Sequence, residues 1–269
     1  MTDSQSPDDY CYRHPKRVSY VLCQRCARTI CVECQIAASV GVHCPECDRE
    51  AKKKRPKVRT RRGGDRTPVT TGLLATMAVV YLGQLVTGGV ITDLLLYWPP
   101  LTLTEPWRMV TSLFVHSESS FFHILFNGYS LWVLGTLLER LLGRTRFFLL
   151  FLISGAGGSL AVLWLAPGSA VVGASGAIFG LFGALLVVQR SFGVTNPQLV
   201  IVLVINLVMG FIVPGISWQA HIGGLLTGLA IAWGLVKARE SAKTLGSIGI
   251  FLAVVGVIAV LTLTQFILA

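Results

Sequence analysis

Two residues in the apolar half of the chain could act together as a serine nucleophile and its base. Ser175 lies in the string GASGAIFG, and His221 lies in WQAHIGGLLTG. A serine hydroxyl becomes an effective nucleophile when an imidazole removes its proton, and acyl transfer also needs donors aimed at the developing oxyanion. His123 and Asn127 lie four residues apart, hence on one helical face, and could serve as such donors with the backbone amide of Ser175.

The segments around this pair contain no acidic residue. Neither 174–190 nor 218–236 holds an Asp or Glu, so the sequence predicts a Ser-His dyad and not a Ser-His-Asp triad. Small residues at helical spacing would let the two segments approach closely. They are Gly176, Gly180, Gly183, Gly224 and Gly228. Such glycines also serve ordinary helix packing, so they support the arrangement without proving activity.

A second candidate chemistry is metal binding near the N-terminus, where all seven cysteines occur. Four ligand pairs, each with two residues between its members, could complete two tetrahedral sites. The pairs are Cys11 and His14, Cys23 and Cys26, Cys31 and Cys34, and Cys44 and Cys47. These ligands suit zinc, and four per site leave no position for substrate. A segment of about 40 residues can hardly fold on its own core, so we expect two structural zinc ions to supply the folding energy.

The order of these pairs resembles the B-box type of zinc finger, in which alternate pairs share a metal. The resemblance implies one site formed by Cys11, His14, Cys31 and Cys34, and another formed by Cys23, Cys26, Cys44 and Cys47. It leaves open whether His43 replaces Cys44 and whether neighbouring pairs combine instead. Disulfides are the weaker alternative, because the number of cysteines is odd and the module is expected in a reducing compartment.

The composition is that of a membrane protein. Of 269 residues, 53% are hydrophobic and only 13% are charged, with a mean hydropathy of +0.66, which excludes a soluble globular protein. Uncharged stretches predict seven spans, because the two longest must fold back at Pro167-Gly168 and Pro214-Gly215. The expected spans lie near 70–90, 121–141, 147–166, 174–190, 197–213, 218–236 and 247–268. The fold class is therefore an all-α polytopic membrane protein.

Charge divides the chain into three parts and orients it. The net charge is +10, and residues 49–66 carry most of the excess. Because Lys and Arg favour the cytoplasmic side, we expect a cytoplasmic zinc module at 1–48, a basic linker at 49–66 and a membrane domain at 67–269. Arg140, Arg144, Arg146, Arg190, Lys237, Arg239 and Lys243 then also lie inside, and Arg108 and the C-terminus lie outside. The polar N-terminal region predicts no cleavable signal peptide.

The basic linker could bind either anionic membrane lipid or nucleic acid. Its charge would attract anionic membrane lipid. Nucleic-acid binding is the minority hypothesis, because no aromatic residue interrupts the run to offer a stacking surface.

Five ordered motifs between about residues 70 and 237 resemble the rhomboid family of intramembrane serine proteases. They are Glu105-Pro-Trp107-Arg108, His116 ahead of His123-x3-Asn127, Gly135-x3-Glu139-x3-Gly143, Gly173-Ala-Ser175-Gly176, and Ala220-His221-x2-Gly224-x3-Gly228. The resemblance implies a six-helix catalytic core, with a site open to the outside, and the seventh span makes a six-plus-one arrangement. One departure is Phe179, where many members carry tyrosine; its ring can still stack on His221.

The leading hypothesis is a serine endopeptidase that uses Ser175 and His221 to cleave other membrane proteins near the outer side of a bacterial plasma membrane. The resemblance implies single-span substrates with helix-weakening residues and a small residue before the scissile bond. The alternative is a catalytically inactive rhomboid-like protein that binds membrane clients, and retention of both residues argues against it. A transporter is a third class, but the sequence lacks paired intramembrane carboxylates and an inverted repeat. The zinc module is expected to bind a cytoplasmic protein partner and to take no part in hydrolysis.

Overall fold

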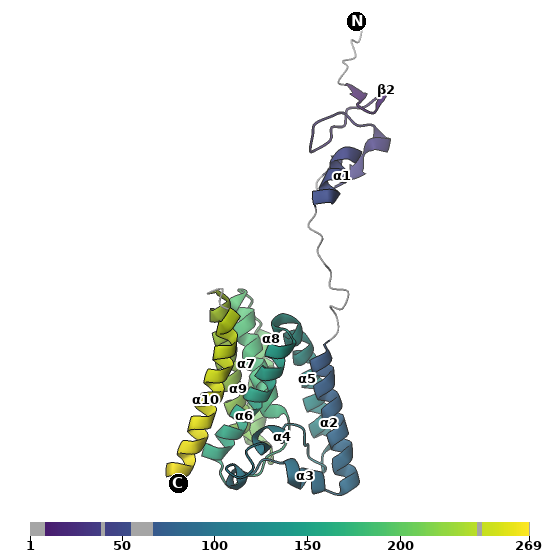
Figure 1. Ribbon diagram of the computed structural model, residues 1–269. Helices are drawn as coiled ribbons and strands as arrows, with labels where there is room; N and C mark the ends of the chain where they lie inside the picture. Colours follow the sequence, from purple (N-terminus) through teal and green to yellow (C-terminus); the bar gives the residue numbers. More distant parts are fainter. Residues whose placement is uncertain (1–8, 39–40, 55–66, 241–243, 269) are drawn as a thin grey trace. The chain divides into compact units, whose positions relative to one another are not determined.

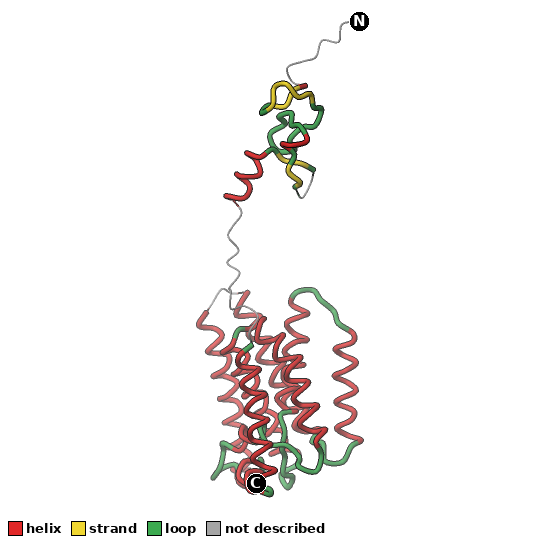
Figure 2. Tube along the Cα trace, turned by 90° about the vertical axis from the view of Figure 1, so that its right-hand side faces the viewer, coloured by secondary structure: helices red, strands yellow, loops and turns green. Residues whose placement is uncertain are grey.

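The computed structural model describes residues 9–38, 41–54, 67–240 and 244–268, and the chain divides into two compact units, Met1–Gly64 and Asp65–Ala269. The first unit contains short strands and helical segments, and the second unit is helical (Figure 2). Residues 49–54 of the predicted basic linker belong to a helix, and its residues 55–66 lie outside the described part of the chain. Lys243 also lies outside that part, as do residues 1–8 of the predicted zinc module.

The first unit is built from very short elements around its cysteines. Strand β1 (Tyr10–Cys11) pairs antiparallel with β2 (His14–Val18), and β3 (Ile36–Ala37) pairs with β4 (Val42–His43). A 3-10 turn, η2 (Val32–Cys34), and helix α1 (Pro45–Lys54) complete it. Its buried hydrophobic cluster consists of six cysteines and Ile30 among the described residues. Such a core is too small to stabilise a fold without cross-links or metal.

The second unit contains one apolar helix for each of the seven predicted spans. They are α2 (Pro68–Thr87), α5 (Phe121–Leu142), α6 (Arg144–Leu165), α7 (Ser175–Ser191), α8 (Pro197–Ile212), α9 (Trp218–Glu240) and α10 (Thr244–Leu268). Among the described residues, five of these are long and apolar enough to cross a membrane, and α7 and α8 are shorter. The all-α polytopic class is thus confirmed. Helix α2 ends before the predicted 90 because Gly88 and Gly89 adopt left-handed φ values of +58° and +95°.

Helix α7 forms the centre of this unit and is buried along most of its length. It packs between α6 and α9, while α10 lies against α6 and α9 and is mostly exposed. The glycine spacing explains the closest contact. A Cβ atom at Gly224 would collide with the carbonyl oxygen of Gly176, and one at Gly228 would collide with that of Gly180. Glycine therefore lets the backbones of α7 and α9 touch.

Short helices between α2 and α5 gather at one end of the bundle, where α10 also ends, and α2 begins at the opposite end (Figure 1). They are α3 (Val90–Leu95), η3 (Pro99–Leu101) and α4 (Arg108–Thr111). The buried Arg108 forms an ion pair with Glu105 and donates to the carbonyl of Leu96 at 3.1 Å. The Glu-Pro-Trp-Arg motif therefore orders this connection by binding the end of α3.

Candidate active site and metal centres

Ser175 and His221 meet where α7 and α9 begin. Ser175 is the first residue of α7, and His221 lies in the first turn of α9. The Oγ atom of Ser175 lies 3.0 Å from Nε2 of His221, which is within hydrogen-bond distance. The histidine is buried and the serine is half-buried. The structure thus brings together two residues that are far apart in the sequence but carried by helices in backbone contact.

The ring of His221 is held by stacking. It lies on the ring of Phe179, one turn along α7 from Ser175, with 4.1 Å between centroids and 12° between planes. The Nδ1 atom is buried and has no hydrogen-bond partner within the described part of the chain. The imidazole of His221 is therefore oriented by an aromatic face on one side and by its contact with Ser175 Oγ.

His123 and Asn127 of α5 face the turn before Ser175. Gly173 in that turn has φ +108°, and a Cβ atom there would lie 2.6 Å from Nε2 of His123 and 3.8 Å from Nδ2 of Asn127. The Gly173 amide donates to the carbonyl of Ser112 at 2.9 Å, which ties this turn to the segment after α4. The turn therefore has no room for a side chain, and two polar groups border it next to the serine.

The hydrogen bonds of His123 define where its proton lies. The backbone amide of Ser117 donates to Nδ1 of His123 at 3.2 Å. Because Nδ1 accepts, the neutral ring carries its proton on Nε2, the atom that faces Gly173. Asn127 is buried, and its Nδ2 donates to the carbonyl of His123 at 2.8 Å, which uses one of the two amide hydrogens. Both side chains therefore have an N–H group available beside the turn that contains Gly173.

Two polar contacts in this unit were not predicted. Gln84 of α2 is fully buried and bonds the backbone of His116; the signal available in the sequence was a lone amide in an apolar stretch. Glu139 of α5 accepts from the backbone amides of Val69 and Thr70 in the first turn of α2. The Gly-x3-Glu-x3-Gly motif therefore joins two helices away from Ser175.

His116, in the loop before α5, packs edge-on against the ring of His123, with 5.2 Å between centroids. It is fully buried, and its Nδ1 contacts the carbonyl of Phe114 at 3.3 Å. Burial, with a smaller contribution from His123, lowers the pKa of His116 to about 4. His116 is therefore neutral at physiological pH.

The cysteines and His14 of the first unit form two groups of four. Each group has its ligand atoms within 4.8 Å of one another: Cys11, His14, Cys31 and Cys34 in one, and Cys23, Cys26, Cys44 and Cys47 in the other. Alternate pairs therefore combine, as the B-box resemblance implies, and the second group contains Cys44 and not His43.

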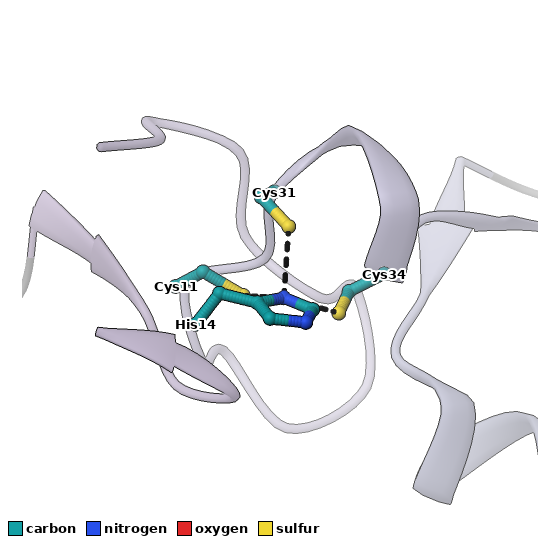
Figure 3. Close-up of side chains that lie close together, drawn as sticks. All are labelled: Cys11, His14, Cys31 and Cys34. Atoms are coloured by element: carbon teal, nitrogen blue, oxygen red, sulfur yellow. Dashed lines mark hydrogen bonds between the residues drawn. The ribbon is translucent and has the colours of Figure 1, made fainter. Parts of the chain in front are cut away.

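Figure 3 shows Nδ1 of His14 pointing at the three sulfur atoms of the first group. It lies 3.3 Å from Cys31 Sγ, 3.5 Å from Cys34 Sγ and 3.8 Å from Cys11 Sγ. A tetrahedral ion with bonds of about 2.0 to 2.3 Å separates its ligands by about 3.3 to 3.8 Å. The donor set and its dimensions therefore fit a four-coordinate metal.

Backbone hydrogen bonds favour the thiolate form of one cysteine in each group, whereas burial raises the pKa of Cys34 to about 11 and that of Cys47 to about 12. Burial disfavours the thiolate of Cys11, but backbone amides of Cys31 and Arg13 outweigh burial and lower its pKa to about 6. The pKa of Cys23 is likewise lowered to about 6, because amides of Cys44 and its neighbours outweigh burial. Thiolate is the form that binds metal.

Arg28 supplies positive charge at the second group. It donates to Cys26 Sγ at 3.3 Å and contacts Cys44 Sγ at 3.7 Å. Its guanidinium also bonds Glu46 and lies over the ring of Tyr12 at 4.2 Å from the centroid. The hydrogen bond from Arg28 lowers the pKa of Cys26. Arg28 thus places a fixed cation beside two sulfur atoms of the second group.

Comparisons with known proteins agree with this architecture. A family model described as Rhomboid domain matches residues 103–238. Rhomboid protease GluP of Bacillus subtilis is 39% identical over 156 residues, which is 55% of this chain and 30% of the relative. Putative rhomboid protease YdcA of the same organism is 36% identical over 142 residues, 51% of this chain and 70% of the relative.

A plant relative extends the comparison. RHOMBOID-like protein 6, mitochondrial, of Arabidopsis thaliana is 34% identical over 144 residues, 51% of this chain and 46% of the relative. The matches therefore span less than a third of GluP and less than half of the plant protein. The match to the family model lies in the helical unit that carries Ser175 and His221. This multi-pass membrane protein belongs to the rhomboid family.

Proposed function

We propose that this chain is an intramembrane serine endopeptidase with Ser175 as nucleophile and His221 as base. The observation that carries the proposal is the 3.0 Å contact between Ser175 Oγ and His221 Nε2. The family relationship supports it, since two of the relatives are named as proteases. A client-binding protein without activity would have no chemical need for this pair.

The geometry suggests a sequence of proton transfers. His221 Nε2 removes the proton of Ser175 as Oγ attacks the scissile carbonyl carbon, and the carbonyl oxygen becomes an oxyanion. The imidazolium then protonates the leaving nitrogen, and the C–N bond breaks to leave an acyl-enzyme. Water attacks the acyl carbon, His221 takes its proton, and Ser175 leaves with that proton restored. One peptide bond and one water are consumed per cycle.

The oxyanion would be stabilised by three N–H groups. They are Nε2 of His123, the side-chain amide of Asn127 and the backbone amide of Ser175. Donors held before the reaction begins lower the barrier because they need no reorganisation in the transition state. The acceptor bond at His123 Nδ1 supports this assignment, since it places the remaining proton on the side that faces Gly173.

We propose single-span transmembrane proteins as substrates, cut near the outer side of a bacterial plasma membrane. Helix α7 begins at the end of the bundle that holds α3 and α4 (Figure 1). Arg140 lies near the end of α5, Arg144 begins α6 and Arg190 lies near the end of α7, so all three belong to the opposite end of the bundle. Arginine residues at the ends of spans favour the cytoplasmic side. The serine would then act outside, where the substrate helix must unwind to expose its carbonyls.

The N-terminal unit is proposed to hold two structural zinc ions and to bind a cytoplasmic protein, such as a substrate tail, an adaptor or a second copy. Eight ligands close two four-coordinate shells, so the metals would stabilise the fold and leave no open position for water activation. We accordingly propose a zinc module at 1–48, a basic linker at 49–66 and a protease domain at 67–269.

The deciding experiment compares the purified full chain with its Ser175→Ala variant in liposomes. A panel of single-span substrates is supplied, and the fragments are identified by mass spectrometry. Cleavage by the full chain only, with one water added per cut, would support the protease. Client binding by both proteins with no cleavage by either would support the inactive alternative.

A further inference from the structure

Gln84 is a fully buried amide near the end of α2, a helix that contains no charged residue. Its Oε1 accepts from the backbone amide of His116 at 3.0 Å, and its Nε2 donates to the carbonyl of His116 at 2.8 Å. Nε2 also donates to Oγ1 of Thr92 at 2.7 Å. One side chain therefore pairs with both backbone groups of a single loop residue, as a neighbouring strand would.

This pairing restricts the backbone on both sides of His116. The residue lies in the loop between α4 and α5, where no regular element satisfies its amide and carbonyl. Without Gln84, two buried backbone groups of His116 would lose their partner, which is costly in a membrane protein. The next peptide group along the chain is the amide of Ser117, whose direction follows from the orientation of His116.

The amide of Ser117 is the group that bonds Nδ1 of His123 at 3.2 Å. The ring of His116 also packs edge-on against the ring of His123. Both the tautomer and the tilt of His123 thus depend on a short segment whose backbone is held by Gln84. No direct contact joins Gln84 to the reacting groups within the described part of the chain.

We infer that Gln84 is a positioning residue, which keeps the Nε2–H of His123 aimed at the oxyanion by holding the backbone of His116 and Ser117. This role rests on the oxyanion function proposed for His123. It assigns a part in hydrolysis to α2, a helix that carries none of the proposed reacting groups.

The test is a double-mutant cycle on the full chain in detergent. Gln84→Met keeps the approximate length of the side chain but removes its hydrogen bonds. Because small misplacement of a reacting group can cost about 100-fold, we expect kcat to fall by about 10- to 100-fold, with little change in KM. In the His123→Ala background the same change should cause no further loss, because residues that act as a unit are not additive.

Two control variants separate positioning from general damage to α2. Thr76→Val removes an exposed hydroxyl that bonds the carbonyl of Gly72, and it should retain wild-type turnover. Glu139→Gln weakens the hydrogen bonds that hold the first turn of α2. Any factor by which it lowers kcat should therefore be the same in the wild-type and His123→Ala backgrounds. If Gln84→Met lowers kcat by the same factor in the wild-type and His123→Ala backgrounds, Gln84 has a general structural role and the inference is overturned.

A second readout does not depend on activity. Nitrogen-15 spectra of the histidine side chains, assigned by comparison with His123→Ala, should show a protonated Nε2 on His123 in the wild type and a mixture of tautomers in Gln84→Met. If Gln84→Met fails to fold, Gln84→Glu takes its place and is measured where its carboxyl group is ionised, because a carboxylate still accepts from the His116 amide but cannot donate to the His116 carbonyl. An unchanged His123 spectrum in the folded variant would contradict the inference.

The outcomes also distinguish this inference from the proposed function. Wild-type turnover in Gln84→Met, with impaired turnover in His123→Ala, would overturn the role of Gln84 alone. Wild-type turnover in His123→Ala would refute the oxyanion role, and the positioning role would fall with it. Absence of Ser175-dependent cleavage in the wild type would refute the protease itself.

Discussion

Phe179 and His221 lie face to face, with ring centroids 4.1 Å apart and planes inclined by only 12°. The stack joins α7 to α9 one turn from Ser175. Because Nδ1 of His221 has no partner within the described residues, the ring of Phe179 is the clearest restraint on the orientation of the imidazole.

Replacing Phe179 should therefore change catalysis more than folding. We expect Phe179→Leu to lower kcat by about 10-fold or more, since a mispositioned base transfers protons less effectively. Phe179→Tyr should preserve turnover because the ring is kept. The matched control is Phe151→Leu, which alters a buried ring of α6 instead of the ring that stacks on His221. Equal turnover in Phe179→Leu and Phe151→Leu would contradict an orienting role for the stack.

Ser175 should react with a fluorophosphonate probe, and His221→Ala should abolish labelling because an unactivated hydroxyl is a poor nucleophile. Labelling is measured by gel fluorescence, and the modified peptide is identified by mass spectrometry. Ser154→Ala is the control. Because Ser154 Oγ is also buried in the bundle and should not react with the probe, this variant should label like the wild type. Undiminished labelling of the His221→Ala protein would show that His221 is not the base.

Asn127→Ala and His123→Ala should each lower turnover by about 100- to 1000-fold, the usual cost of losing one oxyanion donor. Asn206 offers a close control. Its Nδ2 donates to the carbonyl of Val202 at 2.8 Å, the same contact that Asn127 makes with the carbonyl of His123. Asn206→Ala should therefore retain activity. Thermal unfolding in detergent checks that the inactive variants are folded, and full activity in Asn127→Ala would leave Asn127 with a packing role only.

Metal analysis of the purified chain should return about two zinc ions per molecule. Cys23→Ser should lose at least one, because it removes a ligand from one closed shell. His43→Ala should retain both, since the second group contains Cys44 in place of His43. A metal content of one or none in the wild type would refute the two-site arrangement.

Removal of residues 1–66 should leave Ser175-dependent cleavage of a generic substrate largely intact in detergent. The reason is that all proposed reacting groups belong to the helical unit. In cells, the same truncation should change which substrates are cut or how much enzyme accumulates. Loss of cleavage of every substrate by a folded, truncated protein would show that the N-terminal unit takes part in hydrolysis.

The sequence by itself determined the features that depend on local composition and spacing. Seven apolar helices could be predicted because a bilayer requires long runs without charge, and the breaks at Pro167-Gly168 and Pro214-Gly215 follow from chain length. The eight ligands could be predicted because paired cysteines at short separation chelate from one turn. The types of Ser175 and His221, with glycine beside them, likewise identified a dyad candidate.

Only the tertiary structure decided the features that depend on contacts between distant segments. The placement of Cys44, and not His43, beside Cys23, Cys26 and Cys47 is a property of the folded chain, as is the combination of alternate ligand pairs. The tautomer of His123 follows from a bond to Ser117, and the buried Gln84 finds its partners across a connection with no regular repeat. Hydrogen bonds of this kind depend on direction and distance at the scale of 3 Å, which residue type and periodicity do not specify.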